Sequence, residues 1–437
     1  MKVVFGGVVF IYHVVVDDSQ QRGAAEYRRR ARIAGRGQDG GVVWCFGDIN
    51  GRPGTVNTLI SLGDGFAIDG GCELCDVCNG TPSGFCFLDD VCWCTVREYG
   101  LVHGPPFIVE SVGDGVVEVA VGDTVVPVFS AQCGDCADCL SDRSNICSGL
   151  PIRPGGMPRD GTSRFSFAST GEPIHHFISV SSFSEYTVVD VAHLVKIEPG
   201  GIPHEMACLL SCCVSTGVGA AWKVAAVEPG SSVAVFGLGA VGLAVTQGCR
   251  MRGAKRIIGI DLNPEKFEIG KKLGITDFID PNGTDGRTVS EVIKEMTGGG
   301  ADYCFECIGS TPVMAEAFKS SRKGWGKTIV LGVSNDVAPI SIPSHDILRG
   351  RSVVGSLFGG LKPKTDIPVL AQMYLDKELE LEEFVTHEMG FNEINTALEL
   401  LTQGKCLRCI IWMDGAREKE NVVKVKPKEN GRACEAA

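Results

Sequence analysis

The chain has 437 residues, of which 44% are hydrophobic and 22% charged, and its formal net charge is −12. This length suits two or three folded domains, and the acidic balance argues against nucleic acid or an anionic membrane as the main partner. The 20 cysteines predict either a set of disulfides or metal ligation, depending on the redox compartment.

The first hundred residues carry no pattern from which a domain can be assembled. Residues 3–16 are almost all apolar and predict a strand or a leader segment, too short to cross a bilayer. Residues 22–36 are basic, and residues 37–69 are rich in glycine with little periodicity. We therefore leave residues 1–100 unassigned. They are either disordered or the product of a mispredicted translation start or unspliced sequence.

From residue 107 the sequence changes to short apolar runs joined by Gly-Asp turns. Such runs with closely spaced turns are typical of an all-β domain. The predicted strands are residues 107–113, 116–119, 124–129, 183–189 and 194–197.

One cysteine cluster in this β-rich region has the spacing of a zinc site, C-x2-C-x2-C-x7-C. Its members are Cys133, Cys136, Cys139 and Cys147. Four thiolates complete a tetrahedral shell around Zn²⁺ and leave no open position, so the cluster predicts a structural rather than a catalytic zinc. The same spacing occurs upstream, at Cys72, Cys75, Cys78 and Cys86. There it marks either a second zinc site or a chance match in cysteine-rich sequence.

A later stretch has the pattern of a strand, a glycine-rich turn, a helix and a second strand that ends in an acid. Gly237, Gly239 and Gly242, with Leu238 inside the turn, allow a tight turn, close approach of a pyrophosphate and packing of the helix on the sheet. The helix N-terminus offers unpaired N–H groups to the phosphates. Asp261 ends the second strand, where a carboxylate accepts ribose hydroxyls and repels a 2′-phosphate. The stretch predicts NAD binding.

Strands and helices alternate over residues 214–357, which is the doubly wound α/β pattern of a parallel sheet covered by helices. The predicted strands are residues 232–236, 256–260, 303–307 and 328–331, and the predicted helices are residues 241–252, 265–273, 289–296 and 313–321. Residues 358–413 return to mixed character. The charged tail, residues 414–437, is predicted to be disordered.

The residues from about 107 to 413 resemble the zinc-dependent medium-chain alcohol dehydrogenases, and most of all their plant alcohol dehydrogenase-like branch. The resemblance rests on long stretches such as GDTVVPVFSAQCGDCADCLSDRSNIC, LLSCCVSTGVGAAW, VFGLGAVGLA and GSLFGGLKPKTDIP. It implies a GroES-like β-rich catalytic domain in two parts, residues 101–213 and 358–413. A Rossmann domain at residues 214–357 separates them, and the resemblance also implies a homodimer formed through the Rossmann sheets.

The resemblance also implies roles for individual residues. Cys133, Cys136, Cys139 and Cys147 would bind the structural zinc. Cys212 matches a cysteine ligand of the family's catalytic zinc, although on its own it would be interpreted as a buried apolar thiol. Thr216 matches a residue beside the nicotinamide. Asp261 and Lys266 match the pair that holds the adenosine ribose, and Arg408 matches an arginine at the cofactor pyrophosphate.

The catalytic zinc site departs from the family pattern, which needs three protein ligands and an open position for the alcohol oxygen. His103 has the family spacing of the histidine ligand, but Gly104 follows it where the family has glutamate, so it is either the ligand or an accidental match. The first cysteine ligand is not found at its expected spacing. The nearest cysteines are Cys78, Cys86, Cys92 and Cys94. Cys213 stands where the family has glycine.

The sequence thus predicts a zinc-dependent, NAD-linked alcohol dehydrogenase that passes hydride from a small-molecule alcohol to NAD⁺, leaving an aldehyde or ketone. We expect it in the cytoplasm, because thiolate zinc sites need a reducing compartment. Two alternatives stay open. One is an S-(hydroxymethyl)glutathione dehydrogenase, whose branch has an arginine after the fourth zinc cysteine, although Arg153 is out of register for it. The other is an NAD- and zinc-binding homologue that lacks an intact catalytic zinc site.

Overall fold

The computed structural model describes residues 107–152, 156–166, 173–182, 186–334, 338–390 and 393–412, together with five strands nearer the N-terminus. Several sequence-based expectations lie outside these residues and stay predictions. They are the ligand role of His103, the upstream cluster Cys72, Cys75, Cys78 and Cys86, the nearby Cys92 and Cys94, and the disordered tail at residues 414–437.

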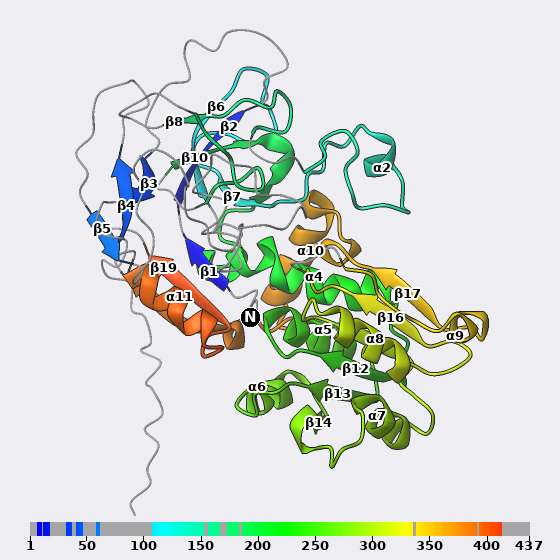
Figure 1. Ribbon diagram of the computed structural model, residues 1–437. Helices are drawn as coiled ribbons and strands as arrows, with labels where there is room; N and C mark the ends of the chain where they lie inside the picture. The colour runs from blue at the N-terminus through cyan, green and yellow to red at the C-terminus, as the bar shows by residue number, and fades with distance from the viewer. Residues whose placement is uncertain are drawn as a thin grey trace, which may run out of the picture.

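The largest sheet in the described residues has six strands in the order β14-β13-β12-β15-β16-β17, and every pairing in it is parallel (Figure 1). Its strands are β12 (Ser232–Phe236), β13 (Arg256–Ile260), β14 (Asp277–Ile279), β15 (Tyr303–Glu306), β16 (Lys327–Val330) and β17 (Ser352–Gly355). Chain order reverses beside β12, and open α/β sheets bind ligands at this reversal point. The predicted doubly wound fold is confirmed, with β14 and β17 as strands that the periodicity did not reveal.

Helices cover both faces of this sheet because alternate side chains of each strand point to opposite sides. On β12, Val233 and Val235 pack with Leu243 of α5, whereas Ala234 and Phe236 pack with Ile293 of α7. The four helices are α5 (Ala240–Met251), α6 (Lys266–Leu273), α7 (Val289–Thr297) and α8 (Thr311–Ser320). Burial on both faces explains why the strands are continuous apolar runs without alternation.

A second, mixed sheet forms the β-rich part, in the order β10-β2-β6-β7-β11. Its strands are β2 (Tyr12–Asp17), β6 (Phe107–Val112), β7 (Thr124–Pro127), β10 (Tyr186–Asp190) and β11 (Leu194–Ile197). A smaller parallel sheet pairs β1 (Gly7–Phe10), β19 (Arg408–Trp412) and β18 (Val385–Gly390). The apolar run at residues 3–16 therefore contributes one strand to each of these sheets.

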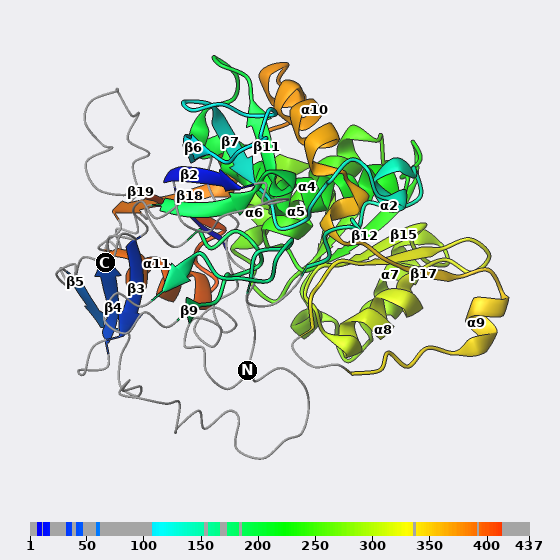
Figure 2. The same cartoon turned by 90° about the horizontal axis from the view of Figure 1, so that it is seen from above.

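Two further sheets are small. One is the antiparallel set β3 (Arg32–Arg36), β4 (Gly41–Phe46) and β5 (Thr58–Ser61), which lies apart from the six-stranded sheet (Figure 2). The other pairs β8 (Phe165–Ser166) with β9 (Pro173–Ile174).

Six further helices lie in the described residues. They are α2 (Ala137–Leu140), α3 (His204–Ala207), α4 (Cys213–Gly219), α9 (Ser344–Leu348), α10 (Pro363–Leu375) and α11 (Ile394–Thr402). Short 3₁₀ segments include η1 (Val191–His193), η2 (Cys208–Ser211), η4 (Pro281–Gly283), η5 (Phe358–Gly360) and η6 (Glu382–Phe384), and η3 (Ala220–Val224) is a π-helical turn. In the described ranges no single helix is long and apolar enough to cross a membrane. The helical segments His204–Ser211 and Cys213–Val224 reach the length and apolar composition of a membrane span only when they are taken together, and they are bent by 56° relative to each other.

The helix α4 crosses α5 at close range, which brings its N-terminal end near the dinucleotide turn. A Cβ added to Gly217 would lie 2.5 Å from Cβ of Ala244 and 2.6 Å from the carbonyl oxygen of Val241. Only glycine permits this approach, since any larger side chain would push the two helices apart. The crossing therefore places α4, which has Cys212 as its N-cap and contains Thr216, against α5 (Figure 1).

Candidate functional site

The turn between β12 and α5 uses each of its glycines for a different physical reason. Gly237 has φ +93°, a left-handed conformation that favours glycine. A Cβ on Gly242 would lie only 1.8 Å from the carbonyl oxygen of Gly237, so glycine is needed for the helix to start this close to the strand. A Cβ on Gly239 would have no heavy atom within 4 Å. The turn is therefore tightly packed at Gly242, whereas the space next to Gly239 is open.

The helix α5 begins under this open space with its backbone N–H groups uncapped. Its N-cap is Gly239, and no side chain caps its first turn. Unpaired N–H groups and the positive end of the helix dipole form a binding site for a phosphate. Leu238 is fully buried below the turn, which leaves the open side to the ligand. This geometry fits the pyrophosphate of a dinucleotide.

Asp261 lies at the end of β13, next to the same turn. Its Oδ2 accepts the N–H of Leu238 at 2.8 Å, and its Oδ1 accepts the N–H of Asn263 at 2.8 Å. Lys266 Nζ lies 3.7 Å from Oδ2. These contacts fix the carboxylate while each oxygen keeps a lone pair for a ribose hydroxyl. The structure therefore brings together Gly237, Leu238, Gly239, Gly242, Asp261 and Lys266, as the sequence predicts.

The four cysteines of the predicted structural zinc site lie in one cluster beside α2. Their sulfur atoms all lie within 4.8 Å of one another. Sγ of Cys133 is 3.8 Å from Sγ of Cys139, and Sγ of Cys136 is 3.9 Å from Sγ of Cys147. Zn–S bonds of about 2.3 Å in a tetrahedron place the sulfurs about 3.8 Å apart. The residues present therefore fit a Zn²⁺ ion.

Backbone N–H groups also point at these sulfurs, as expected around thiolates. Cys136 N–H donates to Sγ of Cys133 and Cys139 N–H to Sγ of Cys136, both at 3.4 Å, and Leu150 N–H donates to Sγ of Cys147 at 3.3 Å. The N–H of Cys139 lowers the pKa of Cys136 to about 5, while burial raises the pKa of Cys133 to about 11. Cys136 is therefore a thiolate at neutral pH, whereas Cys133 needs the positive charge of a metal to ionise.

Two residues that the sequence does not single out attach the zinc lobe to the rest of the protein. Lys362 Nζ donates to the carbonyl oxygens of Cys139 at 2.9 Å and Ser141 at 2.7 Å. Asn145 Nδ2 donates to the carbonyl oxygens of Leu357 at 2.9 Å and Leu361 at 3.2 Å. The hydrogen-bonded residues lie far apart in the sequence, so the local spacing of residues could not predict these contacts.

Cys212, Thr216 and Arg408 lie close together at the interface between the β-rich part and the six-stranded sheet with its helices. Burial raises the pKa of the Cys212 thiol to about 12, Cys213 adds to the shift, and the Arg408 guanidinium and the Thr216 hydroxyl oppose it. Arg408 is itself only 8% exposed and donates to the carbonyl oxygen of Leu407 at 2.7 Å. Without a metal beside it, Cys212 is therefore a neutral thiol at physiological pH.

Comparison with known proteins decides the family. The model for the alcohol dehydrogenase GroES-like domain matches residues 101–199, and the model for zinc-binding dehydrogenases matches residues 240–376. Alcohol dehydrogenase-like 2 of Arabidopsis thaliana is 59% identical over 320 residues, which cover 72% of this chain and 81% of that protein. The chain belongs to the zinc-dependent alcohol dehydrogenase family.

Solved structures agree with this assignment. An alcohol dehydrogenase zinc-binding domain protein from Burkholderia ambifaria is 32% identical, with a TM-score of 0.63, and benzyl alcohol dehydrogenase from Acinetobacter calcoaceticus is 30% identical, with a TM-score of 0.60. Each match covers 70% of this chain and 81% of the other. The predicted family, the Rossmann and GroES-like fold and the alcohol dehydrogenase-type oxidoreductase function are confirmed, with zinc and NAD as the cofactors of this family.

The catalytic zinc of the alcohol dehydrogenase family does not find a complete ligand set among the described residues. Within them, only the Cys133 cluster brings three or more His, Cys, Asp or Glu ligand atoms close enough to hold a metal. Cys212 is placed at the interface between the two parts of the fold, but no described pair of ligands joins it, and His103 lies outside the described residues. The described chain therefore does not fit a catalytic zinc by itself.

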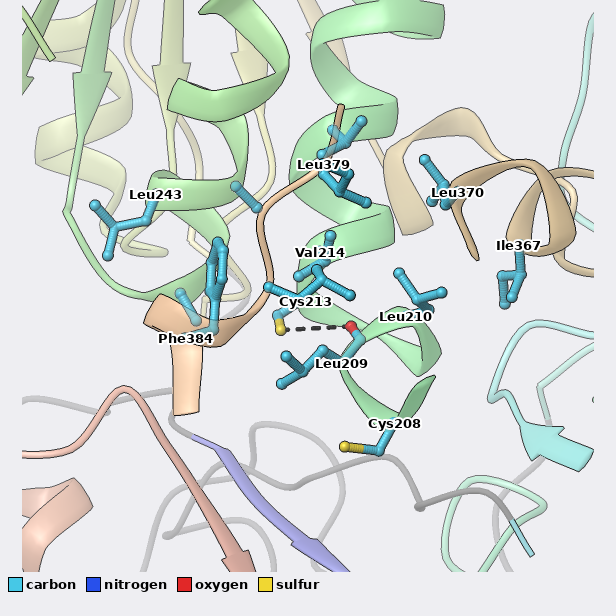
Figure 3. Packing of buried hydrophobic residues seen from close by; sticks show 14 of the residues in the cluster. Cys208, Leu209, Leu210, Cys213, Val214, Leu243, Ile367, Leu370, Leu379 and Phe384 are labelled. Carbon is cyan, nitrogen blue, oxygen red and sulfur yellow. Dashed lines mark hydrogen bonds between the residues drawn. The ribbon is translucent and has the colours of Figure 1, made fainter. Parts of the chain in front are cut away.

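Cys213, which departs from the family's glycine, has become part of the core. It is 2% exposed, and its Sγ donates to the carbonyl oxygen of Leu209 at 3.6 Å (Figure 3). Figure 3 shows it beside Val214, with Leu210 and Phe384 also in the surrounding cluster. A small thiol in such a place behaves as an apolar side chain. Cys213 thus contributes to packing next to Cys212, and it belongs to no metal-ligand group among the described residues.

Proposed function

We propose that this chain oxidises a small-molecule alcohol with NAD⁺ rather than NADP⁺ as the hydride acceptor. The observation that carries the choice of cofactor is the fixed carboxylate of Asp261, held by the N–H groups of Leu238 and Asn263 beside the glycine turn. A 2′-phosphate at that place would meet a negative charge. Bound NAD⁺ supplies the carbon that accepts the hydride.

Each residue of the cofactor site has a separate task in this proposal. The first N–H groups of α5 bind the pyrophosphate, with the guanidinium of Arg408 as a second positive group. Asp261 accepts the ribose hydroxyls, and the charge of Lys266, 3.7 Å from its carboxylate, is positioned to contact the same ribose. Thr216, next to Cys212 on α4, lies on the nicotinamide side. The benzyl alcohol dehydrogenase among the similar structures favours primary alcohols as the first substrates to test.

The cofactor preference is tested with Asp261→Asn, which keeps the shape of the side chain and removes its charge. We expect NADH binding to weaken about tenfold and NADPH binding to improve, because the repulsion of the 2′-phosphate disappears. Fluorescence titration with both cofactors measures this change. Glu265→Gln, an exposed acid on the adjoining turn, is the control and should alter neither affinity. An unmodified protein that prefers NADPH would contradict the proposal.

A second candidate is an NAD- and zinc-binding protein without turnover. It is favoured by the observation that Cys212 has no metal-ligand pair beside it among the described residues. One zinc per chain, NADH binding and no oxidation of alcohols would support it. Two zincs with turnover would support the enzyme, and the double variant Cys72→Ser, Cys75→Ser tells whether the second zinc belongs to the upstream cluster.

The remaining alternative within the enzyme class is S-(hydroxymethyl)glutathione dehydrogenase. Turnover of S-(hydroxymethyl)glutathione, compared with that of aliphatic and aromatic primary alcohols, separates it from the alcohol dehydrogenase proposed here. A clear preference for the glutathione adduct would favour that alternative.

We also propose that two copies of the chain associate through the edge of the six-stranded sheet. β17 is the last strand in the order, and its outer edge offers unpaired backbone groups to a partner strand. Large apolar side chains are exposed on neighbouring segments, among them Trp325 at 62%, Ile347 at 43% and Leu348 at 81%. Light scattering on the purified chain, with Leu348→Glu as the disrupting variant, tests this association.

We propose a reducing compartment, the cytoplasm, as the location. Four thiolates of one zinc site stay available for the metal only where they are not oxidised to disulfides. Imaging of a fluorescent fusion tests the location, and a signal in the secretory pathway would contradict it.

A further inference from the structure

Glu306 is a fully buried acid whose role the cofactor site does not explain. It is the last residue of β15, 0% exposed, and it pairs with Phe236 of β12 on one side and Val330 of β16 on the other. It therefore lies at the carboxyl edge of the sheet, beside the point where the strand order reverses. Burying a carboxylate costs desolvation free energy unless nearby groups compensate its charge. The contacts of Glu306 therefore indicate its role.

The side chain of Glu306 holds the loop that follows its own strand. Its Oε1 accepts the N–H groups of Ile308 at 3.0 Å, Gly309 at 2.8 Å and Ser310 at 3.4 Å. Ser310 is the N-cap of α8, and the side chain of Ser310 makes no cap hydrogen bond. The carboxylate thus occupies the anion position at this helix N-terminus.

The main chain of Glu306 holds a second loop, the one after β16. Its carbonyl oxygen accepts the N–H groups of Leu331 at 2.9 Å and Gly332 at 3.0 Å. One residue therefore binds residues 308–310 with its side chain and residues 331–332 with its backbone. A change of the side chain at position 306 is therefore expected to displace both loops.

The two loops also touch each other without room for a methyl group. A Cβ on Gly309, which has φ +87°, would lie 2.2 Å from the carbonyl oxygen of Val333. A Cβ on Gly332 would lie 2.0 Å from the backbone nitrogen of Gly309 and 2.6 Å from Oε2 of Glu306. Ile308 in turn packs directly against Gly237 of the dinucleotide turn. The loops after β15 and β16 therefore form one packed unit around the carboxylate, and Ile308 is the contact of this unit with the dinucleotide turn.

The second oxygen of Glu306 faces this unit without a hydrogen-bond partner in the described chain. Burial raises the pKa of Glu306, and the surrounding N–H groups, with Gly309 first among them, oppose the shift. Burial thus makes the carboxylate costly, and the loop N–H groups that it accepts compensate part of this cost. Its contacts point to a role in holding the loops rather than in filling space.

Two helices, α5 and α8, begin at the carboxyl edge of the sheet, and different groups lie at their N-termini. At α5 the space above Gly239 is open and no side chain caps the helix, whereas at α8 the carboxylate of Glu306 already takes the anion position. In this strand order the two halves of a dinucleotide lie on opposite sides of β12. Asp261 marks the adenosine side, so the loops held by Glu306 line the nicotinamide side.

We propose that Glu306 is a positioning residue for the nicotinamide half of the cofactor. It fixes the loops at residues 307–310 and 331–334 as one unit, and that unit sets the nicotinamide without contact between Glu306 and the cofactor. The inference rests on the proposed NAD-linked function. It predicts that Glu306 matters for ligands that include the nicotinamide half and not for ligands that end at the second ribose.

The test compares NADH with ADP-ribose, which lacks the nicotinamide, by calorimetry on the full chain and on Glu306→Gln. We expect the variant to bind NADH at least about tenfold more weakly, because the acceptor of the three loop N–H groups loses its charge and its hydrogen bonds weaken, and to bind ADP-ribose within about twofold of the unmodified chain. A merely structural role would weaken both ligands alike. The matched control is Glu291→Gln, an exposed acid that accepts the N–H of Thr288 at 2.8 Å in the capping box of α7.

A second variant tests the same unit if Glu306→Gln does not fold. Gly332→Ala keeps the carboxylate but places a methyl between the two loops, and we expect the same selective loss of NADH binding. Equal losses for NADH and ADP-ribose, or no loss for either, would overturn the inference while the proposed function stands. An unmodified chain that binds ADP-ribose but not NADH would overturn both.

Discussion

Two cysteine regions of this chain match zinc ligands of the alcohol dehydrogenase family, and the structure treats them in opposite ways. The cluster from Cys133 to Cys147 brings four sulfurs within 4.8 Å of one another and surrounds them with N–H donors. Cys212 is a single thiol whose pKa burial raises to about 12. The first site is contained in one short loop, whereas the second depends on ligands brought from elsewhere. Ligands within one short loop can reach a metal without distant segments, whereas a site assembled from several segments depends on how those segments pack.

The largest expected effect comes from removing one ligand of the local site. Cys147→Ala leaves three thiolates, which cannot complete the tetrahedral shell, and we expect loss of roughly one zinc per chain and faster hydrogen exchange over residues 133–150. Zinc analysis and hydrogen exchange over the lobe measure both. Cys249→Ala, which removes a buried thiol inside α5, is the control. Full retention of zinc by the Cys147 variant would remove the distinction between the two regions.

The corresponding change in the second region is Cys212→Ser. We expect this variant to keep the zinc of the lobe and to lose alcohol oxidation by at least about a hundredfold, as expected when a position at the reacting centre is altered. Steady-state kinetics with a primary alcohol, alongside zinc analysis, gives the result. Unchanged turnover would show that Cys212 takes no part in the reaction, and loss of the lobe zinc would show that the two regions are not independent.

Chemical reactivity should sharpen the same contrast in protein from which zinc has been removed. The N–H of Cys139 lowers the pKa of Cys136 to about 5, so this sulfur is a thiolate above that pH, whereas Cys212 with its pKa near 12 stays protonated at pH values well below 12. Thiolates are the reactive form, and we expect iodoacetamide at about pH 7 to modify Cys136 at least tenfold faster. Peptide mapping by mass spectrometry measures the two rates. Equal rates would mean that the local N–H donors do not activate Cys136.

The smallest expected effect concerns the contacts that attach the lobe. Lys362→Met removes the hydrogen bonds to the carbonyl oxygens of Cys139 and Ser141, and we expect a loss of about 2 kcal/mol in the unfolding free energy, with faster hydrogen exchange in the lobe. Denaturant unfolding gives the first value. Lys364→Met is the control. It removes only an ion pair with the exposed Glu118 and should lower the unfolding free energy by less than about 1 kcal/mol. Equal costs for the two variants would contradict the anchoring role.

Where sequence reasoning succeeded, the informative residues were close together along the chain. The spacing of the cysteines around α2 and of Gly237, Gly239 and Gly242 encodes geometry directly, since a few residues can reach only a few positions relative to one another. Asp261 followed from the strand that ends beside the same turn. The strands β14 and β17 were missed because they lie at the edges of the sheet and are mostly half-buried, so they lack the continuous apolar run of the central strands.

Residues whose partners come from remote segments could not be found in this way. Lys362 and Asn145 join the zinc lobe to a segment more than two hundred residues away. Glu306 is one acid among many in the sequence, and only burial at the reversal point of the sheet distinguishes it. The pairing of β1 with β19 and of β2 with β6 and β10 is likewise invisible in the apolar run near the N-terminus.

The sequence by itself predicted the local features of this protein: a zinc cluster, a dinucleotide turn and the acid on which the proposed preference for NAD depends. These features depend on spacing within one loop or one strand-turn-helix unit, where covalent connection limits the geometry. Only the tertiary structure decided which groups are desolvated and which distant loops share a hydrogen-bonded residue. Burial and contact between remote segments follow from the packing of the whole chain, and no short stretch of sequence carries that information.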